Sequence, residues 1–349
     1  MKQKMINRNL RKGLTHYGWE GALLGLLVVE ILLFGLANPR MLDVNTLLFS
    51  TSDFITIGIV ALPLTMVIVS GGIDISFGST IGLCAIALGV LCQAGIPLPL
   101  AIGLTLLLGA ACGLLNAALI LYTGVNPLVI TLGTLYLFGG SALLLSGLAG
   151  ATGFEGIGDF PAAFTDFANL TVLGLPMPLI IFLLMTLFFW ALMHRTRTGR
   201  NVFLIGQNAR VARYGALPVQ RTLFALYGMT GLASAIASIV MTSYFGSARS
   251  DLGVSLLMPA ITAVVLGGAN IYGGSGSVLG TALATLLIGY LQQGLQMIGI
   301  SSQVSSALSG ALLILVVIGR SASLNRGLIR SVFQRYRRRW SASSSSLTS

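Results

Sequence analysis

Residues 53–93 decide the fold, and they read DFITIGIVALPLTMVIVSGGIDISFGSTIGLCAIALGVLCQ. Two uncharged, mainly apolar runs, 54–69 and 77–92, flank a short polar stretch that contains glycine. A helix rises about 1.5 Å per residue, so roughly 17–25 apolar residues cross the ~30 Å hydrocarbon core of a bilayer. The sequence therefore predicts two transmembrane helices here, over 53–70 and 77–93, joined by a tight break.

The composition of the whole chain supports this interpretation. Of 349 residues, 55% are hydrophobic, 44 are glycine and only 8% are charged, against about 25% charged in a soluble domain. So few charges cannot cover a water-facing surface, and so apolar a chain does not stay solvated when unfolded. A soluble enzyme and a disordered protein are both excluded. We predict an all-α polytopic membrane protein of about ten transmembrane helices, near 21–38, 53–70, 77–93, 98–122, 126–148, 174–193, 221–244, 255–269, 278–297 and 303–319.

The basic residues predict which side of the membrane each loop occupies. Of the 20 Lys and Arg residues, all but Arg40 and Arg249 lie in three clusters, at 2–12, 195–221 and 320–339. Short basic segments stay in the cytoplasm beside anionic lipid. Because six and then four predicted spans separate the clusters, both termini and the central loop share the cytoplasmic side. The net charge of +11 thus indicates topology and contact with membrane lipid, and no nucleic-acid partner is expected.

This topology divides the chain into three parts. They are a basic cytoplasmic N-terminus (1–20), a transmembrane domain (21–320) and a basic, serine-rich cytoplasmic tail (321–349). Within the membrane domain, 195–220 forms a cytoplasmic loop. The loop 151–178 lies on the opposite side and carries Glu155, Asp159 and Asp166 without any basic residue.

The chain is poor in residues that carry out bond chemistry. Lysine occurs only at positions 2, 4 and 12, so no Gly-Lys-Ser/Thr loop can hold nucleotide phosphates. The two histidines, His16 and His194, stand beside basic clusters, and the three cysteines lie in apolar runs as small hydrophobes. We expect no catalytic residue, no metal site and no cofactor bound by this chain.

The first polar motif is the break Ser70–Ser79, which reads SGGIDISFGS. Gly71 and Gly72 free the backbone, and Asp74 or Ser76 can accept bonds from the N–H groups that open the next helix. A carboxylate at a helix break is a candidate polar point on a substrate route. The alternative is a capped tight turn at the cytoplasmic face.

A second run, Gly267–Gly280, repeats this pattern with Gly-Gly, then Asn270, then a serine before the next helix. Both runs are predicted on the same side of the membrane, so they form a weak internal repeat. Asn270 joins the candidates for the translocation path or helix break. The alternative role of the glycines is to let helices approach closely.

The central loop contains a six-residue helix between Asn208 as N-cap and Gly215 as C′ residue. Arg210 and Arg213 share one face of it, while Val211 and Tyr214 share another. Such small, apolar and basic faces suit a protein partner, and the alternative is a helix resting on anionic lipid. The candidate contact residues of the loop are Thr198, Gly199, Arg200, Gly206, Asn208, Ala209, Arg210, Ala212, Arg213 and Gly215.

Other charged residues lie within or beside the apolar spans. Glu30, Asp53 and Asp74 could bind a coupling proton, although Asp53 also fits a helix cap. On the outer side, Glu155, Asp159, Arg249 and Asp251 are candidates for a docking face. The alternative is that acidic residues are simply retained on that side.

These motifs together resemble the ribose/arabinose-type permeases of ABC importers over about residues 18–321. Two further runs, Asn126–Tyr136 and Ser243–Gly253, are similar to the group of these permeases that imports autoinducer-2. The resemblance implies a translocation subunit that works with a second related permease, two cytoplasmic ATP-binding subunits and a periplasmic solute-binding protein in the bacterial inner membrane. ATP would be bound by the partner subunits.

The same resemblance implies that the central loop docks on the ATP-binding subunits. The loop departs from the family pattern, because it reads Gly206-Gln207-Asn208 and Tyr214-Gly215-Ala216-Leu217 where relatives more often have Gly-Gly-Asn and Ser-Gly-Ile. The expected function is ATP-driven import of a small, uncharged, hydroxyl-rich ligand, autoinducer-2. The alternatives are a pentose permease of the same type, a proton-coupled secondary transporter, and a membrane subunit with a purely structural role.

Overall fold

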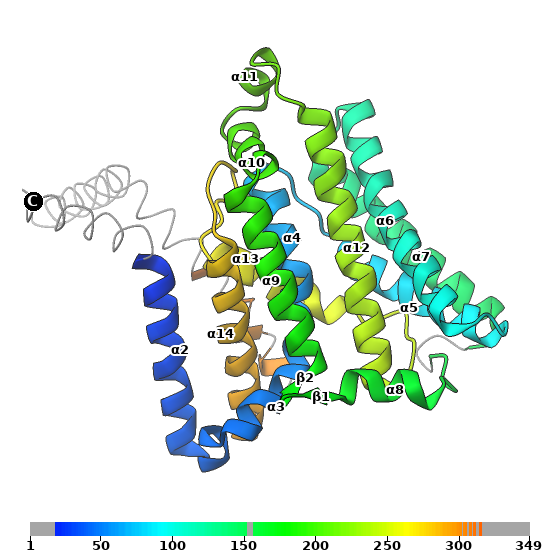
Figure 1. The fold of residues 1–349 in the computed structure, drawn as a ribbon, viewed down its shortest axis with the longest axis vertical. Coiled ribbons are helices and arrows are strands. Elements are labelled where there is room, and N and C mark those ends of the chain that lie inside the picture. The colour runs from blue at the N-terminus through cyan, green and yellow to red at the C-terminus, as the bar shows by residue number, and fades with distance from the viewer. Residues whose placement is uncertain are drawn as a thin grey trace, which may run out of the picture.

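The computed structural model describes residues 18–151 and 156–301, together with 303–305, 307–308, 310–311 and 314–315. The described chain is built almost wholly of helices packed side by side, and the predicted all-α membrane fold is confirmed (Figure 1). Helices predominate because lipid offers no partner for backbone N–H and C=O groups, and a helix bonds these groups within itself. The elements in chain order are α2 (Gly18–Ala37), η1 (Pro39–Leu42), α3 (Val44–Phe54), α4 (Thr56–Val69), α5 (Phe77–Gln93), α6 (Leu98–Thr123), α7 (Pro127–Leu148), α8 (Ala162–Asn169), β1 (Thr171–Val172), β2 (Leu175–Pro176), α9 (Met177–Arg195), α10 (Arg197–Gln207), α11 (Ala209–Tyr214), α12 (Val219–Phe245), η2 (Val254–Leu256), α13 (Leu257–Leu266) and α14 (Val278–Met297).

The membrane spans match the apolar runs, but they are not ten equal helices. Six helices in the described part are long and apolar enough to cross a bilayer: α2, α6, α7, α9, α12 and α14. A seventh candidate is the pair α3–α4, which bends by 59° at Ile55. The predicted spans 77–93 and 255–269 correspond to the shorter helices α5 and α13. Of the tenth predicted span, 303–319, the structure describes only 303–305, 307–308, 310–311 and 314–315, so the count of ten stays a prediction.

Local sequence explains where most of these helices begin and end. Prolines occupy the first turn of α6, α7 and α9, where the missing N–H costs nothing. α6 and α12 end at Gly124 and Gly246, both in the left-handed conformation that glycine adopts without strain. Helix α3 begins at Asp43, whose carboxylate accepts the Thr46 N–H at 3.0 Å, and this hydrogen bond lowers the pKa of that carboxyl.

The predicted capping role of Asp53 is wrong. Asp53 lies in the last turn of α3, ten residues after the true cap, Asp43. Its carboxylate accepts a 2.7 Å hydrogen bond from the Tyr244 hydroxyl at the end of α12. The sequence misled because the break between α3 and α4 falls at Ile55, so Asp53 belongs to the end of α3 and the next helix starts only at Thr56.

Helix α4 forms the centre of the bundle. All of its 14 residues are buried, and α9, α12, α13 and α14 pack around it. Helices α6 and α12 pack closely along each other, and Gly109 and Gly113 lie against the backbone of Gly231 and Tyr227. Small residues allow such close approach between membrane helices. The outward faces of α2, α6, α7 and α9 expose leucines, as a lipid-facing surface does.

The two ends of the bundle differ in character. Helices α10 and α11 form one end, and α8 with the β1–β2 hairpin lies at the opposite end (Figure 1). The amide of Ala168 in α8 donates a 3.0 Å hydrogen bond to Ser243 near the end of α12, which fixes α8 at that level. We call the end with α10 and α11 the loop end, and the end with α8 the outer end.

Candidate functional site: the loop end and the two helix breaks

The central loop contains two helices, α10 and α11, where the sequence predicted only the second. Thr196 opens α10 by accepting the Gly199 N–H at 3.3 Å. Asn208 then breaks the helix with an extended backbone, and its side chain accepts the N–H groups of Arg210 at 3.0 Å and Val211 at 3.1 Å. The predicted N-cap at Asn208 and the helix 209–214 are confirmed. The amphipathic run 197–207, which buries Gly199, Val202 and Ile205, is the signal that could have revealed α10.

The end of α11 differs from the prediction by one position. Gly215 has φ −78°, and the left-handed residue is Ala216 with φ +55°. The amide of Leu217 bonds to the Ala212 carbonyl at 3.1 Å, which closes a Schellman turn with Ala216 at C′. The prediction that Gly215 is the C′ residue of α11 is therefore wrong. Ala216 occupies a conformation that an L-residue adopts at a cost.

Replacing Ala216 by glycine is expected to stabilise this turn by about 1 kcal/mol, because glycine has no Cβ to strain the left-handed conformation. Amide hydrogen exchange at Leu217 measures the effect, and exchange should slow several-fold. The control Ala209→Gly makes the same substitution at a helical position of α11, where glycine is expected to cost about 1 kcal/mol. Faster exchange at Leu217 in Ala216→Gly would contradict the assignment.

Helix α11 is exposed on every face except one. Ala212 is buried against Ile205 and Val219. In contrast, 64% of Val211 and 92% of Tyr214 are exposed, and Arg210 and Arg213 are exposed as well. Large apolar side chains beside arginines are typical of a protein-binding surface. This surface, residues 209–214, is called the α11 surface below.

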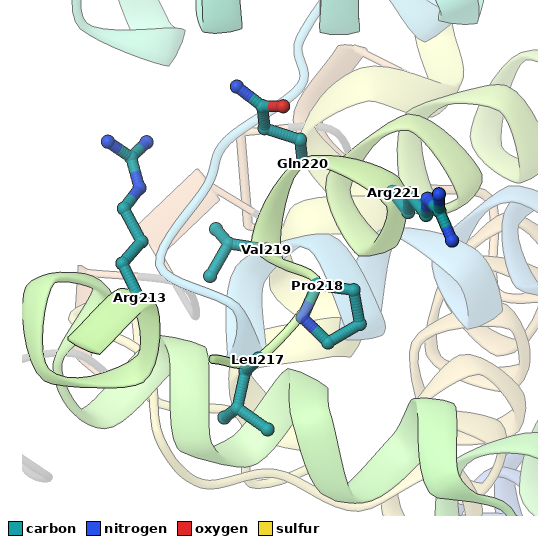
Figure 2. Close-up of a pocket in the computed structure, with 6 residues that line it drawn as sticks. All are labelled: Arg213, Leu217, Pro218, Val219, Gln220 and Arg221. Carbon is teal, nitrogen blue, oxygen red and sulfur yellow. The ribbon is translucent and has the colours of Figure 1, made fainter. Parts of the chain in front are cut away.

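A shallow pocket of about 290 Å³ lies beside the α11 surface, at the turn from α11 to α12 (Figure 2). Leu217 and Pro218 form the turn, and Figure 2 shows Arg213 and Arg221 on opposite sides of it. Val219 and Gln220 complete the lining. The pocket is open and carries two guanidinium groups, so it extends the basic character of the α11 surface.

The other candidate residues of the loop lie along α10. Gly199 is packed so closely on the Met193 carbonyl that a Cβ would overlap it. Gly206 packs in the same way on the carbonyl oxygen of Val69 and the amide of Gly274. Thr198 is half-buried and Arg200 is exposed. Gly206 thus ties the loop to both glycine-containing breaks.

The first break, between α4 and α5, is organised around Asp74. Gly71 has φ +84°, and the Gly72 amide bonds to the Val67 carbonyl, which closes α4. The buried Asp74 carboxylate accepts the Ser76 N–H at 2.9 Å and the Ser76 hydroxyl at 2.7 Å. Asn116 of α6 in turn donates to the Ser76 hydroxyl at 2.7 Å. Of the two predicted acceptors at the start of α5, Asp74 accepts the N–H of the N-cap residue, and Ser76 makes no side-chain cap.

The second break, between α13 and α14, repeats the first in its backbone geometry. In both breaks, three successive backbone amides donate to carbonyl oxygens four, three and five residues earlier in the chain. In the first break these amides belong to Ser70, Gly71 and Gly72, and in the second to Gly267, Gly268 and Ala269. Asn270 accepts the Tyr272 N–H at 3.2 Å, which is the same two-residue spacing as Asp74 and Ser76. The internal repeat in the two breaks is therefore real.

The two breaks also touch each other, which the sequence did not predict. The Gly274 amide donates a 2.8 Å hydrogen bond to the Val69 carbonyl. A Cβ at Gly273 would meet the Gly206 carbonyl and crowd the Gly71 amide. The three motifs of the sequence thus meet at one place below α10. A movement of the central loop would act directly on both breaks.

The candidates at the outer side are less closely grouped. Glu155 lies outside the described residues. Asp159 is exposed with φ +60°, two residues after Ile157, which forms an isolated bridge with Ala248. Arg249 and Asp251 form an ion pair of 2.6 Å. Glu30 of α2 is 8% exposed, and both of its carboxylate oxygens lack a hydrogen-bond partner in the described part of the chain.

Comparison with known proteins identifies the type of molecule. A family model described as the permease component of branched-chain amino acid transport systems matches residues 46–317. The autoinducer 2 import system permease protein LsrD of Yersinia pseudotuberculosis (serotype O:1b, strain IP 31758) is 78% identical over 323 residues, which cover 93% of this chain and 97% of the relative. The protein of the same name from Yersinia enterocolitica (serotype O:8) is 78% identical over 321 residues, 92% of this chain and 97% of the relative.

No solved structure matches this chain. The relatives are named as permease proteins of an import system, so proteins of this kind work as one component among several and are not enzymes themselves. The resemblance noted from the sequence motifs is confirmed, as is the multi-pass membrane character. The chain belongs to the family of membrane-embedded transport permeases described as the permease component of branched-chain amino acid transport systems.

Proposed function

We propose that this chain is the translocation subunit of a binding-protein-dependent ABC importer for autoinducer-2 in the bacterial inner membrane. The observation that carries the ligand is the 78% identity, over 93% of the chain, to relatives named for autoinducer 2 import. The family description names branched-chain amino acids, but it covers a whole permease family. Identity at this level over nearly the whole chain supports the narrower ligand.

The partner subunits follow from what the chain offers and what it lacks. Beyond residue 12 it has no lysine, so a phosphate-binding loop must belong to another subunit. The exposed α11 surface supplies the docking site for one cytoplasmic ATP-binding subunit. A second ATP-binding subunit docks on a second related permease. A periplasmic solute-binding protein delivers the ligand at the outer end, and Asp159 belongs to the surface that would receive it.

The mechanism uses the contact between α10 and the two breaks. ATP binding draws the ATP-binding subunits together and pulls on the α11 surface. Because Gly206 packs on Val69 and Gly274, the pull reaches the end of α4 and the break between α13 and α14. The two halves of the bundle then rock between outward-open and inward-open states, which is alternating access without any bond chemistry in this chain.

Reconstitution in proteoliposomes tests this function. The chain is combined with the second permease, the ATP-binding subunit and the binding protein, and uptake of labelled autoinducer-2 is measured with ATP inside the vesicle. We expect uptake that requires ATP and is displaced by unlabelled autoinducer-2 but not by ribose. Equal displacement by ribose would assign the chain to a pentose importer.

The rival of another class is a proton-coupled transporter, which the buried Glu30 carboxylate favours. The same vesicles separate the two functions. An uncoupler should leave ATP-driven uptake unchanged, and the Glu30→Gln variant should transport normally. Uptake that survives without ATP and collapses with the uncoupler would replace the proposed mechanism.

A further inference from the structure

The chain between α12 and α13 enters the membrane without regular structure. α12 ends at Gly246 with φ +63°, and residues 247–253 belong to no helix. Helix α13 has only ten residues, about 15 Å, and is too short to cross a bilayer alone. Irregular backbone at membrane depth occurs only where it is buried in protein or lines a water-filled cavity.

The depth of this segment follows from its contacts with α5. A Cβ at Gly82 would overlap the Ser250 carbonyl, and a Cβ at Gly253 would overlap the Gly78 carbonyl in the same way. The segment therefore runs along the glycine face of α5 from Gly82 to Gly78. Residues 247–256 are called the re-entrant segment below.

The position of α5 beside α6 shows how deep in the membrane these contacts lie. Ser76 bonds to Asn116 and Cys84 to the Thr105 carbonyl, so Gly78 and Gly82 lie between the levels of Thr105 and Asn116. On α6, Leu98–Thr123, each of those two residues is seven positions from its helix end, or about 10 Å. Ser250 and Gly253 are thus near the middle of the membrane.

Two charged residues flank Ser250, and the Arg249 side chain extends from there toward the outer end, where its Cγ lies against Gly156. Arg249 donates from Nε to one Asp251 oxygen at 2.9 Å and from Nη2 to the other at 2.6 Å. The arginine side chain is 42% exposed and the aspartate 32%. A charged group facing hydrocarbon costs about 3 kcal/mol at the centre of a membrane, and Asp251 holds only two of the arginine's N–H groups. The exposed part of the pair must face water or a polar solute.

The chemistry of the pair defines the solute. Two of the five guanidinium N–H donors are used by Asp251, and the carboxylate keeps free lone pairs. The pair is neutral as a whole, so an ionic solute would have to disturb it. An uncharged molecule with several hydroxyl groups can both accept from the arginine and donate to the aspartate.

We propose that Arg249 and Asp251 line the translocation pathway in the outer half of the membrane and hydrogen-bond to an uncharged, polyhydroxylated solute as it passes. This inference rests on the proposed importer function and replaces the docking role that the sequence suggested for the two residues. The short helices η2 and α13 follow the pair directly, since the Val254 amide that opens η2 donates to the Asp251 carbonyl at 3.0 Å. Helices that begin within the membrane often form the substrate sites of transporters.

Cysteine labelling tests the pathway without reference to the ligand. Ser255 is an exposed residue of the re-entrant segment. The variant Ser255→Cys is treated with a charged, water-soluble methanethiosulfonate reagent. The matched control is Leu107→Cys, which is 67% exposed on an apolar face of α6, between the levels of Thr105 and Asn116. The parent chain, with its three native cysteines, sets the background. We expect labelling of Ser255→Cys above that background and none at Leu107→Cys. Failure to label Ser255→Cys would overturn the proposal.

Transport measurements test the contact with the solute. In Arg249→Lys and Asp251→Asn, uptake should fall about tenfold or more while ATP hydrolysis stimulated by the loaded binding protein stays within about twofold, because the lost bonds are to the passing solute. If uptake and stimulated ATP hydrolysis fell by the same factor, the two residues would have a structural role, and the proposal would be overturned. So would restoration of uptake by the swapped pair Arg249→Asp with Asp251→Arg.

Failure of the proposed function gives a different pattern. If the parent chain does not import autoinducer-2 in an ATP-dependent way, the importer assignment fails in the parent itself. Labelling at Ser255→Cys would still report an aqueous path. The two proposals can therefore fail separately.

Discussion

Reversing both charges of α11, in Arg210→Glu with Arg213→Glu, is expected to lower uptake by about 100-fold or more, since juxtaposed like charges cost several kcal/mol at an interface. Both arginines are exposed, so the fold should change in stability by less than about 0.5 kcal/mol. The loss therefore falls on docking of the ATP-binding subunit. Ligand-stimulated ATP hydrolysis in proteoliposomes measures it directly.

Two controls make this result specific. Arg210→Lys with Arg213→Lys keeps the charge and should retain most of the stimulation. Arg40→Glu reverses one exposed charge on η1, far from the loop end, and should leave coupling intact. If the glutamate pair still couples hydrolysis to uptake, α11 rests on lipid and is not the docking surface.

Adding one methyl group at Gly206 is expected to have the second large effect. The Cβ of Gly206→Ala would overlap the Val69 carbonyl and the Gly274 amide, and neither backbone can move without disturbing a helix break. Overpacking of this kind costs about 1–3 kcal/mol and displaces the loop from both breaks. We expect uptake to fall at least about tenfold, because each 1.4 kcal/mol of displaced equilibrium is a factor of ten.

The matched control is Gly215→Ala in the same loop. Its Cβ would lie 3.5 Å from the Val211 carbonyl, an ordinary contact, and its φ of −78° suits alanine. Thermal unfolding and uptake are measured for both variants. If Gly206→Ala transports as well as Gly215→Ala, the contact between α10 and the breaks does not transmit the movement of the loop.

Much of the architecture could be predicted because lipid leaves the chain few alternatives to helix formation. A chain that must satisfy its backbone internally forms helices wherever it is apolar for long enough, and α5, α6, α7 and α14 begin or end within a residue of their predicted bounds. Capping by Asn208 was predictable as well, since it depends on a side chain two or three residues from its partners.

The sequence-based predictions were wrong where a residue's partner is distant in the chain, or where a helix ends one residue later than its glycine suggests. Asp53 resembles a cap, but its partner is Tyr244, 191 residues away. Gly215 resembles a C′ residue, but the turn closes one residue later because Leu217 packs with Ala212 and Ile205. The depth of Arg249 and Asp251 could not be inferred either, because polar residues just after an apolar run usually mark the membrane surface.

The sequence by itself determined the class of molecule, the basic central loop and the repeated glycine breaks, since these follow from composition, charge and spacing along the chain. Tertiary structure alone decided that Gly206, Val69 and Gly274 meet, and that the re-entrant segment lies beside Gly78 and Gly82 of α5. The physical reason is that glycine specifies only the absence of a side chain. Which backbone fills that space depends on how the other helices pack.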